Sequence, residues 1–378
     1  MHNRRDWLKR VLAVSATLPL GGSLSEQLMA APVSDSERRF RASGFKGPIH
    51  IRLDSNENPY GPSDKARKAI LQSISESNRY PFQAVSEFKQ LLASKEGVTP
   101  DHILVGAGSS DLLCATGSAF GVEEGAILSP NPTFPMLMNY ASIYTAVWDK
   151  VDLNDKLEID YQVLASRVDQ NTKLVFICNP NNPTGTFVDP GIVRSFCEEV
   201  SQKVPVFSDE AYLEFLAPAQ QISMMDLVKQ DKNVIVSKTF SKIYGLAGLR
   251  IGYIVAKPDT IKKIGRHHPG IPTNQMGLAA ATASLGDTAF MDLSRTKNNI
   301  ARKHLTDYLE RNKIFYGKSF TNFVMFDAPS APGEIMRKLA EKGIGIRVWD
   351  FRNKPWCRVS IGTLEEMKLF TKAFDEVV

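Results

Sequence analysis

Seven short runs of apolar residues constrain the fold of this chain more than any other feature. The runs are continuous rather than alternating, which is typical of strands that are buried on both faces of a sheet. They cover residues 102–105, 126–128, 146–151, 174–178, 204–207, 234–237 and 251–255. Segments with helical patterning separate most of them, so the sequence predicts a mostly parallel seven-stranded sheet covered by helices, in one large α/β domain.

The pattern changes after Pro272, where two long helical segments (276–285 and 290–311) precede shorter strands near 323–326 and 358–361. This order predicts a smaller C-terminal α+β domain. We therefore expect a large domain over residues 63–275 and a small domain over residues 276–378. Residues 32–62 are expected to form an N-terminal arm that joins the small domain.

The first 31 residues have the layout of a secretory signal. Arg4 and Arg5 precede a mildly apolar stretch over residues 11–24, and small residues follow at Ala30 and Ala31. Charged, apolar and small-residue regions in this order are typical of a signal peptide. The paired arginines resemble the twin-arginine class, which exports folded proteins. An alternative is a basic amphipathic first helix of the mature protein.

If residues 1–31 are such a signal, the twin-arginine export machinery is a partner and the protein is periplasmic. Without a functional signal it would remain in the cytoplasm. The net charge of +5 over 378 residues is small, so it gives no support to a nucleic-acid partner.

The four cysteines are widely scattered along the chain, and the sequence leaves open whether any of them pair. They are Cys114, Cys178, Cys197 and Cys357. Because they lack the spacing of metal ligands, we expect no zinc site.

Polar clusters follow five of the seven apolar runs. They cover residues 106–111, 131–134, 179–185, 208–212 and 239–242. The carboxyl ends of parallel strands meet at one edge of a sheet, and open α/β sheets bind their ligands there. The clusters therefore predict one binding site that is assembled from five loops.

Lys242 ends the last of these clusters, directly after Ser241, and Arg250 follows eight residues later. A lysine at the end of a buried strand, flanked by hydroxyl groups, is placed to be desolvated and partly deprotonated beside a phosphate. This setting suits a lysine that forms a Schiff base with pyridoxal phosphate (PLP). On this segment alone, an ordinary surface helix beginning near Lys242 is an equal alternative.

Asp209 ends another buried run, where a carboxylate is costly unless it meets a cation. A protonated pyridine nitrogen would be such a cation, and the carboxylate would keep the ring electron-poor. Capping of a following helix is the alternative role. Phe134 could stack on a flat ring or belong to the core, and Asn182 could donate to a ring hydroxyl or simply form a turn.

The first cluster opens a helix with small residues, so that its N–H groups and the hydroxyls of Ser109 and Ser110 can hold a phosphate. A Rossmann dinucleotide site is disfavoured, because Asp111 occupies the place of the third glycine.

Taken in order, these segments resemble the fold-type I PLP-dependent aminotransferases, and more closely the histidinol-phosphate aminotransferases. The motifs that carry the resemblance are Asn182-Pro183-Thr184-Gly185, Asp209-Glu210-Ala211-Tyr212, and Ser241-Lys242 with Arg250. Further matching segments are residues 53–62, 78–81, 132–134, 245–250 and 358–363.

The resemblance implies a role for each matching residue. Lys242 would carry the cofactor and move the proton during catalysis. The other implied cofactor contacts are Asp209 at the pyridine nitrogen, Asn182 and Tyr212 at the ring oxygen, Phe134 on the ring face, and Ser109, Ser110, Thr239, Ser241 and Arg250 at the phosphate. Tyr80 would reach the cofactor phosphate of a neighbouring subunit, which implies a homodimer with shared active sites. Arg358 would bind the anionic group of the substrate, with Arg347 as a second cation and Asn56 on the substrate side.

The implied reaction is transamination of an amino acid or amino-alcohol phosphate, with 2-oxoglutarate as the expected acceptor. The arm segment 41–48 lacks the Pro-Tyr dipeptide that is usual in histidinol-phosphate enzymes. The donor therefore stays open between histidinol phosphate and an aromatic or other amino acid. Another PLP reaction on the same scaffold, such as lyase or decarboxylase chemistry, and a binding protein without turnover are the alternatives.

Overall fold

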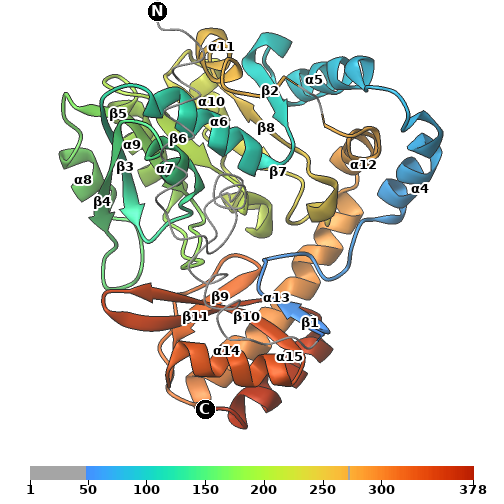
Figure 1. Cartoon of the computed structure of the whole chain (residues 1–378), viewed down its shortest axis with the longest axis vertical. Coiled ribbons are helices and arrows are strands. Elements are labelled where there is room, and N and C mark those ends of the chain that lie inside the picture. The colour runs from blue at the N-terminus through green and yellow to red at the C-terminus, as the bar shows by residue number, and fades with distance from the viewer. Residues whose placement is uncertain (1–47, 271–272) are drawn as a thin grey trace, which may run out of the picture.

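The computed structural model describes residues 48–270 and 273–378 (Figure 1). The predicted signal over residues 1–31, and the arm as far as residue 47, lie outside the described residues. Within the part of the chain that the structure describes, no helix is both long and apolar enough to cross a bilayer.

A seven-stranded sheet forms the centre of the larger part of the molecule. Its strands are β2 (Ile103–Gly106), β3 (Gly125–Asn131), β4 (Ala146–Asp152), β5 (Thr172–Cys178), β6 (Val206–Asp209), β7 (Val234–Thr239) and β8 (Gly252–Val255). Their order is β2-β8-β7-β6-β5-β3-β4, and β8 is antiparallel to both β2 and β7 while the other neighbours pair in parallel. Each strand overlaps one of the seven apolar runs, so the predicted mostly parallel sheet is confirmed.

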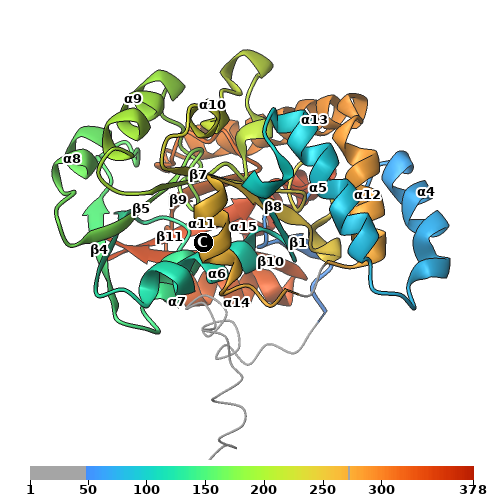
Figure 2. The same cartoon turned by 90° about the horizontal axis from the view of Figure 1, so that it is seen from above.

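Helices cover both faces of this sheet (Figure 2). On one face pack α6 (Ser109–Gly121), α7 (Met136–Ala141) and α11 (Pro258–Gly265). On the other face pack α5 (Phe82–Glu96), α8 (Tyr161–Ser166), α9 (Pro190–Val200), α10 (Met225–Lys229) and α12 (Gln275–Leu285). Central strands are consequently buried along their whole length, as in β7, where every residue is buried. This two-sided burial is why the strands read as continuous apolar runs.

A second, four-stranded sheet lies beside the carboxyl edge of the first. Its strands are β1 (Ile51–Leu53), β9 (Phe323–Asp327), β10 (Ile344–Phe351) and β11 (Lys354–Ser360), in the order β1-β10-β11-β9. The N-terminal strand β1 pairs in parallel with β10. The helices α13 (Thr288–Arg311), α14 (Pro332–Glu341) and α15 (Leu364–Asp375) share one buried apolar core with this sheet.

The remaining elements are α4 (Asp64–Ser73), which packs on α12, and the short 3₁₀ turns η1 (Ile74–Glu76), η2 (Pro100–His102), η3 (Leu213–Phe215), η4 (Pro218–Gln220) and η5 (Ala247–Leu249). The two predicted long helices correspond to α12 and α13, and the predicted strands near 323–326 and 358–361 to β9 and β11. All four cysteines are free thiols, three of them buried.

Candidate active site

A cavity of about 330 Å³ lies at the carboxyl edge of the large sheet, and residues of the arm and of the small sheet also line it. Its lining residues are Ser55, Asn56, Glu57, Ser109, Ser110, Phe134, Cys178, Asn182, Asp209, Ala211, Tyr212, Thr239, Ser241, Lys242, Ala247, Gly248, Arg250, Arg347 and Arg358. The five polar clusters therefore meet in one place. Every predicted site residue except Tyr80 lies in this lining.

Tyr80 lies elsewhere, between η1 and α5, with 74% of its surface exposed. A residue that acts in the site of a neighbouring subunit would not line the cavity of its own subunit. The single chain therefore leaves the predicted role of Tyr80 a prediction.

The N-terminus of α6 and Arg250 form a cradle at one end of the cavity. Gly108 caps α6 with a φ of 82°, and a Cβ atom there would come 2.3 Å from Nη2 of Arg250. The Arg250 guanidinium donates to Ser241 Oγ at 3.3 Å, to Ala247 O at 2.9 Å and to Ala107 O at 3.3 Å. Free helix N–H groups beside a fixed guanidinium make a site for a phosphate group.

Lys242 lies between this cradle and the arm. Its Nζ donates to the carbonyl oxygen of Ser55 at 3.2 Å. Burial lowers the pKa of Lys242 to about 7, with help from the positive charges of Arg358, Arg250 and Arg347, while Glu57 opposes the shift. An amine with this pKa can both hold and release a proton near neutral pH, as a nucleophile or a general base requires.

Asp209 is the buried acid of the cavity, with 3% of its surface exposed. Burial raises the pKa of Asp209 to about 7, although the N–H of Ala211 donates to its Oδ1 at 3.2 Å and the Lys242 charge opposes the shift. A carboxylate that is costly to ionise, at the wall of a cavity, is suited to a ligand that brings a cation.

The hydroxyl group of Tyr212 lies between Asn56 of the arm and Asn182, which follows β5. Asn56 Nδ2 donates to the hydroxyl oxygen at 3.0 Å, and Asn182 Nδ2 approaches the same atom at 3.5 Å. Burial raises the pKa of Tyr212 well above its ordinary value, so the phenol stays neutral and can donate to a ligand oxygen.

Two arginines stand on the small-sheet side, where Arg347 of β10 is the register partner of Arg358 of β11. Arg358 is 4% exposed and donates to Asn182 Oδ1 and to Asp54 O, both at 2.8 Å. Its Nε has no hydrogen-bond partner among residues 48–270 and 273–378. Burial and the nearby Arg347 charge lower the pKa of Arg358 to about 10, so it remains charged near neutral pH. The pair forms a second anion site, separate from the cradle at Arg250.

These features fit PLP. The cradle that a Gly108 side chain would fill suits its phosphate, buried Asp209 suits its pyridine nitrogen, and Lys242 suits its aldehyde carbon. Sequence reasoning missed several residues of the lining, namely Ser55, Glu57, Cys178, Ala211, Ala247 and Gly248. Each of them adjoins a predicted residue or lies within a few positions of one. Only this proximity in the sequence, and not their side-chain chemistry, could have identified them as lining residues.

Comparison with known proteins agrees with this geometry. Residues 48–374 match the family model described as "Aminotransferase class I and II". The chain is 35% identical over 355 residues to histidinol-phosphate aminotransferase 2 of Pasteurella multocida, covering 92% of this chain and 94% of that protein. It is 32% identical over 357 residues to the histidinol-phosphate aminotransferase of Caldicellulosiruptor saccharolyticus, covering 94% of this chain and 98% of that protein.

Among solved structures, the histidinol-phosphate aminotransferase of Sinorhizobium meliloti, determined in complex with pyridoxal-5'-phosphate, superposes with a TM-score of 0.82 at 26% identity, over 96% of this chain and 98% of that one. The predicted aminotransferase resemblance and the fold type I architecture are thereby confirmed. The chain belongs to the class I and II aminotransferases and is similar to histidinol-phosphate aminotransferases over most of its length.

Proposed function

We propose that this PLP-dependent aminotransferase takes its amino group from histidinol phosphate or a closely related donor and passes it to a 2-oxo acid, expected to be 2-oxoglutarate. The observation that carries the proposal is the placement of Lys242 between a phosphate cradle at Arg250 and a second anion site at Arg347 and Arg358. One anion site suits the cofactor phosphate, and the other suits a donor that carries its own negative group.

When bound, PLP supplies an electron-withdrawing ring that stabilises negative charge on the α carbon of the donor. The residues of the chain do the rest. Arg250 and the N-terminus of α6 would hold the phosphate. Asp209 would be ionised beside a protonated pyridine nitrogen and would keep that nitrogen charged. Lys242, with a pKa of about 7, would take the proton from the α carbon of the donor and hold it on Nζ for its return.

An aromatic amino acid is the second candidate donor. The Arg358 guanidinium carbon lies 5.4 Å from the centre of the Phe323 ring and 6.0 Å from the centre of the Trp349 ring. Neither ring belongs to the cavity lining, and the Phe323 side chain is fully buried. The support for this donor is the Arg358 guanidinium itself, which suits the carboxylate of an amino acid.

A half-reaction screen distinguishes the two donors. The PLP-loaded protein is mixed with histidinol phosphate, phenylalanine, tyrosine or aspartate, and the visible band of the bound cofactor is followed without an acceptor. Histidinol phosphate should remove the band at the lowest concentration. If it leaves the band unchanged while aromatic amino acids remove it, the donor assignment is wrong. Reduction with borohydride and peptide mass spectrometry should place the cofactor on Lys242, and a Lys242→Ala protein should show no such adduct.

The proposal also covers the assembly of the enzyme. A homodimer is supported by a group of exposed large side chains on α4, on η1, between η1 and α5, and at the start of α5. They are Leu71, Ile74, Tyr80 and Phe82, which are 69%, 50%, 74% and 66% exposed. Light scattering should give twice the mass of one chain, and Phe82→Glu should lower the measured mass toward that of a single chain.

Export to the periplasm through a twin-arginine signal in residues 1–31 is proposed on the sequence layout alone. Fusion of residues 1–40 to a reporter tests it: Arg4→Lys/Arg5→Lys should abolish export, and export that persists would reject the twin-arginine route.

A further inference from the structure

Asn322 links the small sheet to the arm segment that covers Lys242. It immediately precedes β9 and is 2% exposed. Its Nδ2 donates to the carbonyl oxygens of Asn56 at 2.9 Å and Glu57 at 3.2 Å. Since carbonyl oxygens only accept hydrogen bonds, the amide nitrogen must face the arm and the amide oxygen must face away from it.

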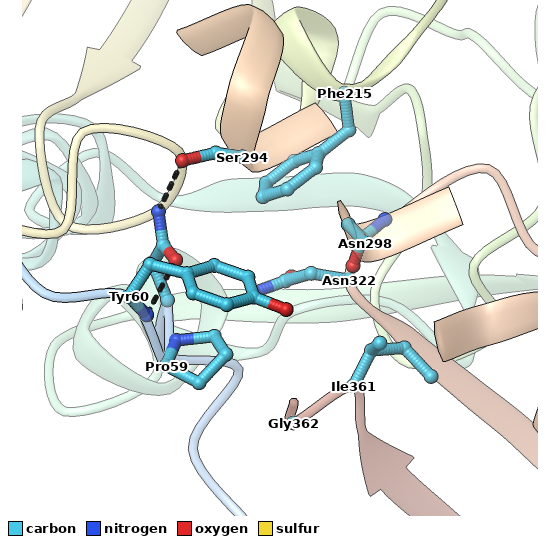
Figure 3. A pocket seen from close by; sticks show the side chains of 9 residues that line it. Pro59, Tyr60, Phe215, Ser294, Asn298, Asn322, Ile361 and Gly362 are labelled. Carbon is cyan, nitrogen blue, oxygen red and sulfur yellow. Dashed lines mark hydrogen bonds between the residues drawn. The ribbon is translucent and has the colours of Figure 1, made fainter. Parts of the chain in front are cut away.

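The amide oxygen of Asn322 is buried and has no hydrogen-bond partner within the described residues. Asn322 also lines a second, small cavity of about 10 Å³ between the arm, α13 and the end of β11. Figure 3 shows the Tyr60 ring reaching into this cavity, between Phe215 and Ile361. A volume of about 10 Å³ is just enough for a single water molecule, and a buried amide oxygen is a group that such a water commonly satisfies.

The segment that Asn322 holds is under local strain. Asn56 has a φ of 53°, in the left-handed region that residues with a side chain seldom adopt, although asparagine tolerates it better than most. Ser360 helps to keep it there, since its Oγ accepts from Asn56 N at 2.7 Å and donates to Asn56 Oδ1 at 3.1 Å. A strained conformation persists only where its surroundings fix it, and Asn322 and Ser360 fix this one from two sides.

The strained segment contacts two residues of the candidate active site, Lys242 and Tyr212. The carbonyl oxygen of Ser55, one residue before Asn56, accepts from Lys242 Nζ at 3.2 Å. The Asn56 side chain donates to the Tyr212 hydroxyl at 3.0 Å. Asn322 is not part of the lining of the candidate active site, and its side-chain hydrogen bonds lead to the arm.

We propose that Asn322 is a positioning residue for Lys242: it fixes the Asn56–Glu57 backbone so that Ser55 O stays aimed at the lysine amine, and one buried water completes its hydrogen bonding. The inference rests on the proposed function only in taking Lys242 as the reacting amine.

Asn322→Asp is the sharpest variant, because it keeps the shape of the side chain but replaces the donor with an acceptor that faces two carbonyl oxygens. Asn298→Asp is the matched control. Asn298 is also buried and lines the same small cavity, but it donates to Thr321 O at 3.2 Å and makes no hydrogen bond to residues 55–57. If Asn322→Asp does not fold, Asn322→Ala removes the donor without adding a charge.

Hydrogen exchange of peptides that cover residues 53–60 is measured first, on the protein without cofactor. This measurement tests the role of Asn322 even if the enzyme turns over none of the donors. Loss of the two hydrogen bonds from Asn322 Nδ2 should speed exchange of the Asn56 amide about tenfold or more, while Asn298→Asp should leave the exchange rate unchanged. In the loaded enzyme, kcat should fall about tenfold with KM within about twofold, because Asn322 does not touch the substrate.

Unchanged exchange in the Asn322 variants, or an equal rise in Asn298→Asp, would overturn the proposal, since the effect would then be absent or a general loosening. A fall in kcat/KM that comes only from KM would overturn the positioning role as well. A high-resolution crystal structure should show one water within hydrogen-bonding distance of Asn322 Oδ1, and a dry cavity would remove that part of the inference.

Discussion

Arg358 of the small sheet donates to Oδ1 of Asn182, a residue of the large sheet's edge, at 2.8 Å. The guanidinium is thereby held against the cavity, while its Nε has no acceptor in the part of the chain that the structure describes. Its position thus depends on both sheets, and it is fixed before any substrate arrives. Pre-organised donors of this kind recognise carboxylate or phosphate by geometry as well as by charge.

Arg358→Lys should therefore be severe although it keeps the charge. A lysine cannot make the forked contact and leaves Asn182 Oδ1 and Asp54 O without donors, which costs about 2–4 kcal/mol and lowers kcat/KM by roughly 30- to 1,000-fold. Arg352→Lys, on the same hairpin but outside the cavity lining, is the control and should stay near wild type. Steady-state kinetics with the best donor measures both. Retention of kcat/KM within threefold in Arg358→Lys would contradict the assignment.

The phosphate cradle is tested by Gly108→Ala. The new Cβ would lie 2.3 Å from Arg250 Nη2, at a φ of 82° that disfavours alanine, so the guanidinium must move. We expect PLP affinity to fall about tenfold to 100-fold, from lost charge-assisted hydrogen bonds and backbone strain. Gly248→Ala is a matched control, because Gly248 also lines the cavity but its Cβ would meet no atom of the described residues within 4 Å. Titration of the cofactor-free protein with PLP gives both constants; equal affinities would rule out a cradle at Gly108.

Asp209 should destabilise the protein when no cofactor is bound. Its pKa is raised to about 7 from an ordinary 3.8, so the native state binds a proton more tightly than the unfolded chain. The destabilisation is absent below pH 3.8, grows up to about pH 7 and is constant above. Asp209→Asn should therefore stabilise the cofactor-free protein by about 2–4 kcal/mol at pH 8 and by much less near pH 4.5.

Urea unfolding of the cofactor-free proteins at the two pH values measures this difference. Asp259→Asn, at a side chain that is 97% exposed, is the control and should change little. Binding of PLP should reverse the order, because the pyridinium ion pairs with the carboxylate and not with the amide. A cofactor-free Asp209→Asn protein that is less stable than wild type at pH 8 would show that the buried acid is already satisfied by other groups.

The sequence predicts the large sheet well because its strands are buried on both faces, and such burial leaves a continuous apolar signal. It predicts β10 poorly, since Arg347 and Asp350 interrupt the run and only pairing with β1 and β11 makes it a strand. The contacts of Asn56 with Tyr212, Ser360 and Asn322 join residues 156 to 304 positions apart. No local pattern marks such contacts, so the chemical groups of the site can be predicted from the sequence, whereas the groups that hold them in place cannot.

Tyr80 provides the last test, since its predicted role requires a second subunit. If Tyr80 acts in the site of its neighbour, Tyr80→Ala and Lys242→Ala should each lower activity, while a mixture of the two refolded together should recover some. Each mixed dimer then has one site with both an intact lysine and an intact tyrosine. Random assortment makes half of the dimers mixed, so about a quarter of wild-type activity should return. Mixing Asp209→Asn with Lys242→Ala is the control, because each change disables the site of the subunit that carries it. A mixed dimer would then have two defective sites, and no activity should return. Failure of the Tyr80→Ala mixture to exceed this control, with mixed dimers shown by mass spectrometry, would place Tyr80 outside the shared site.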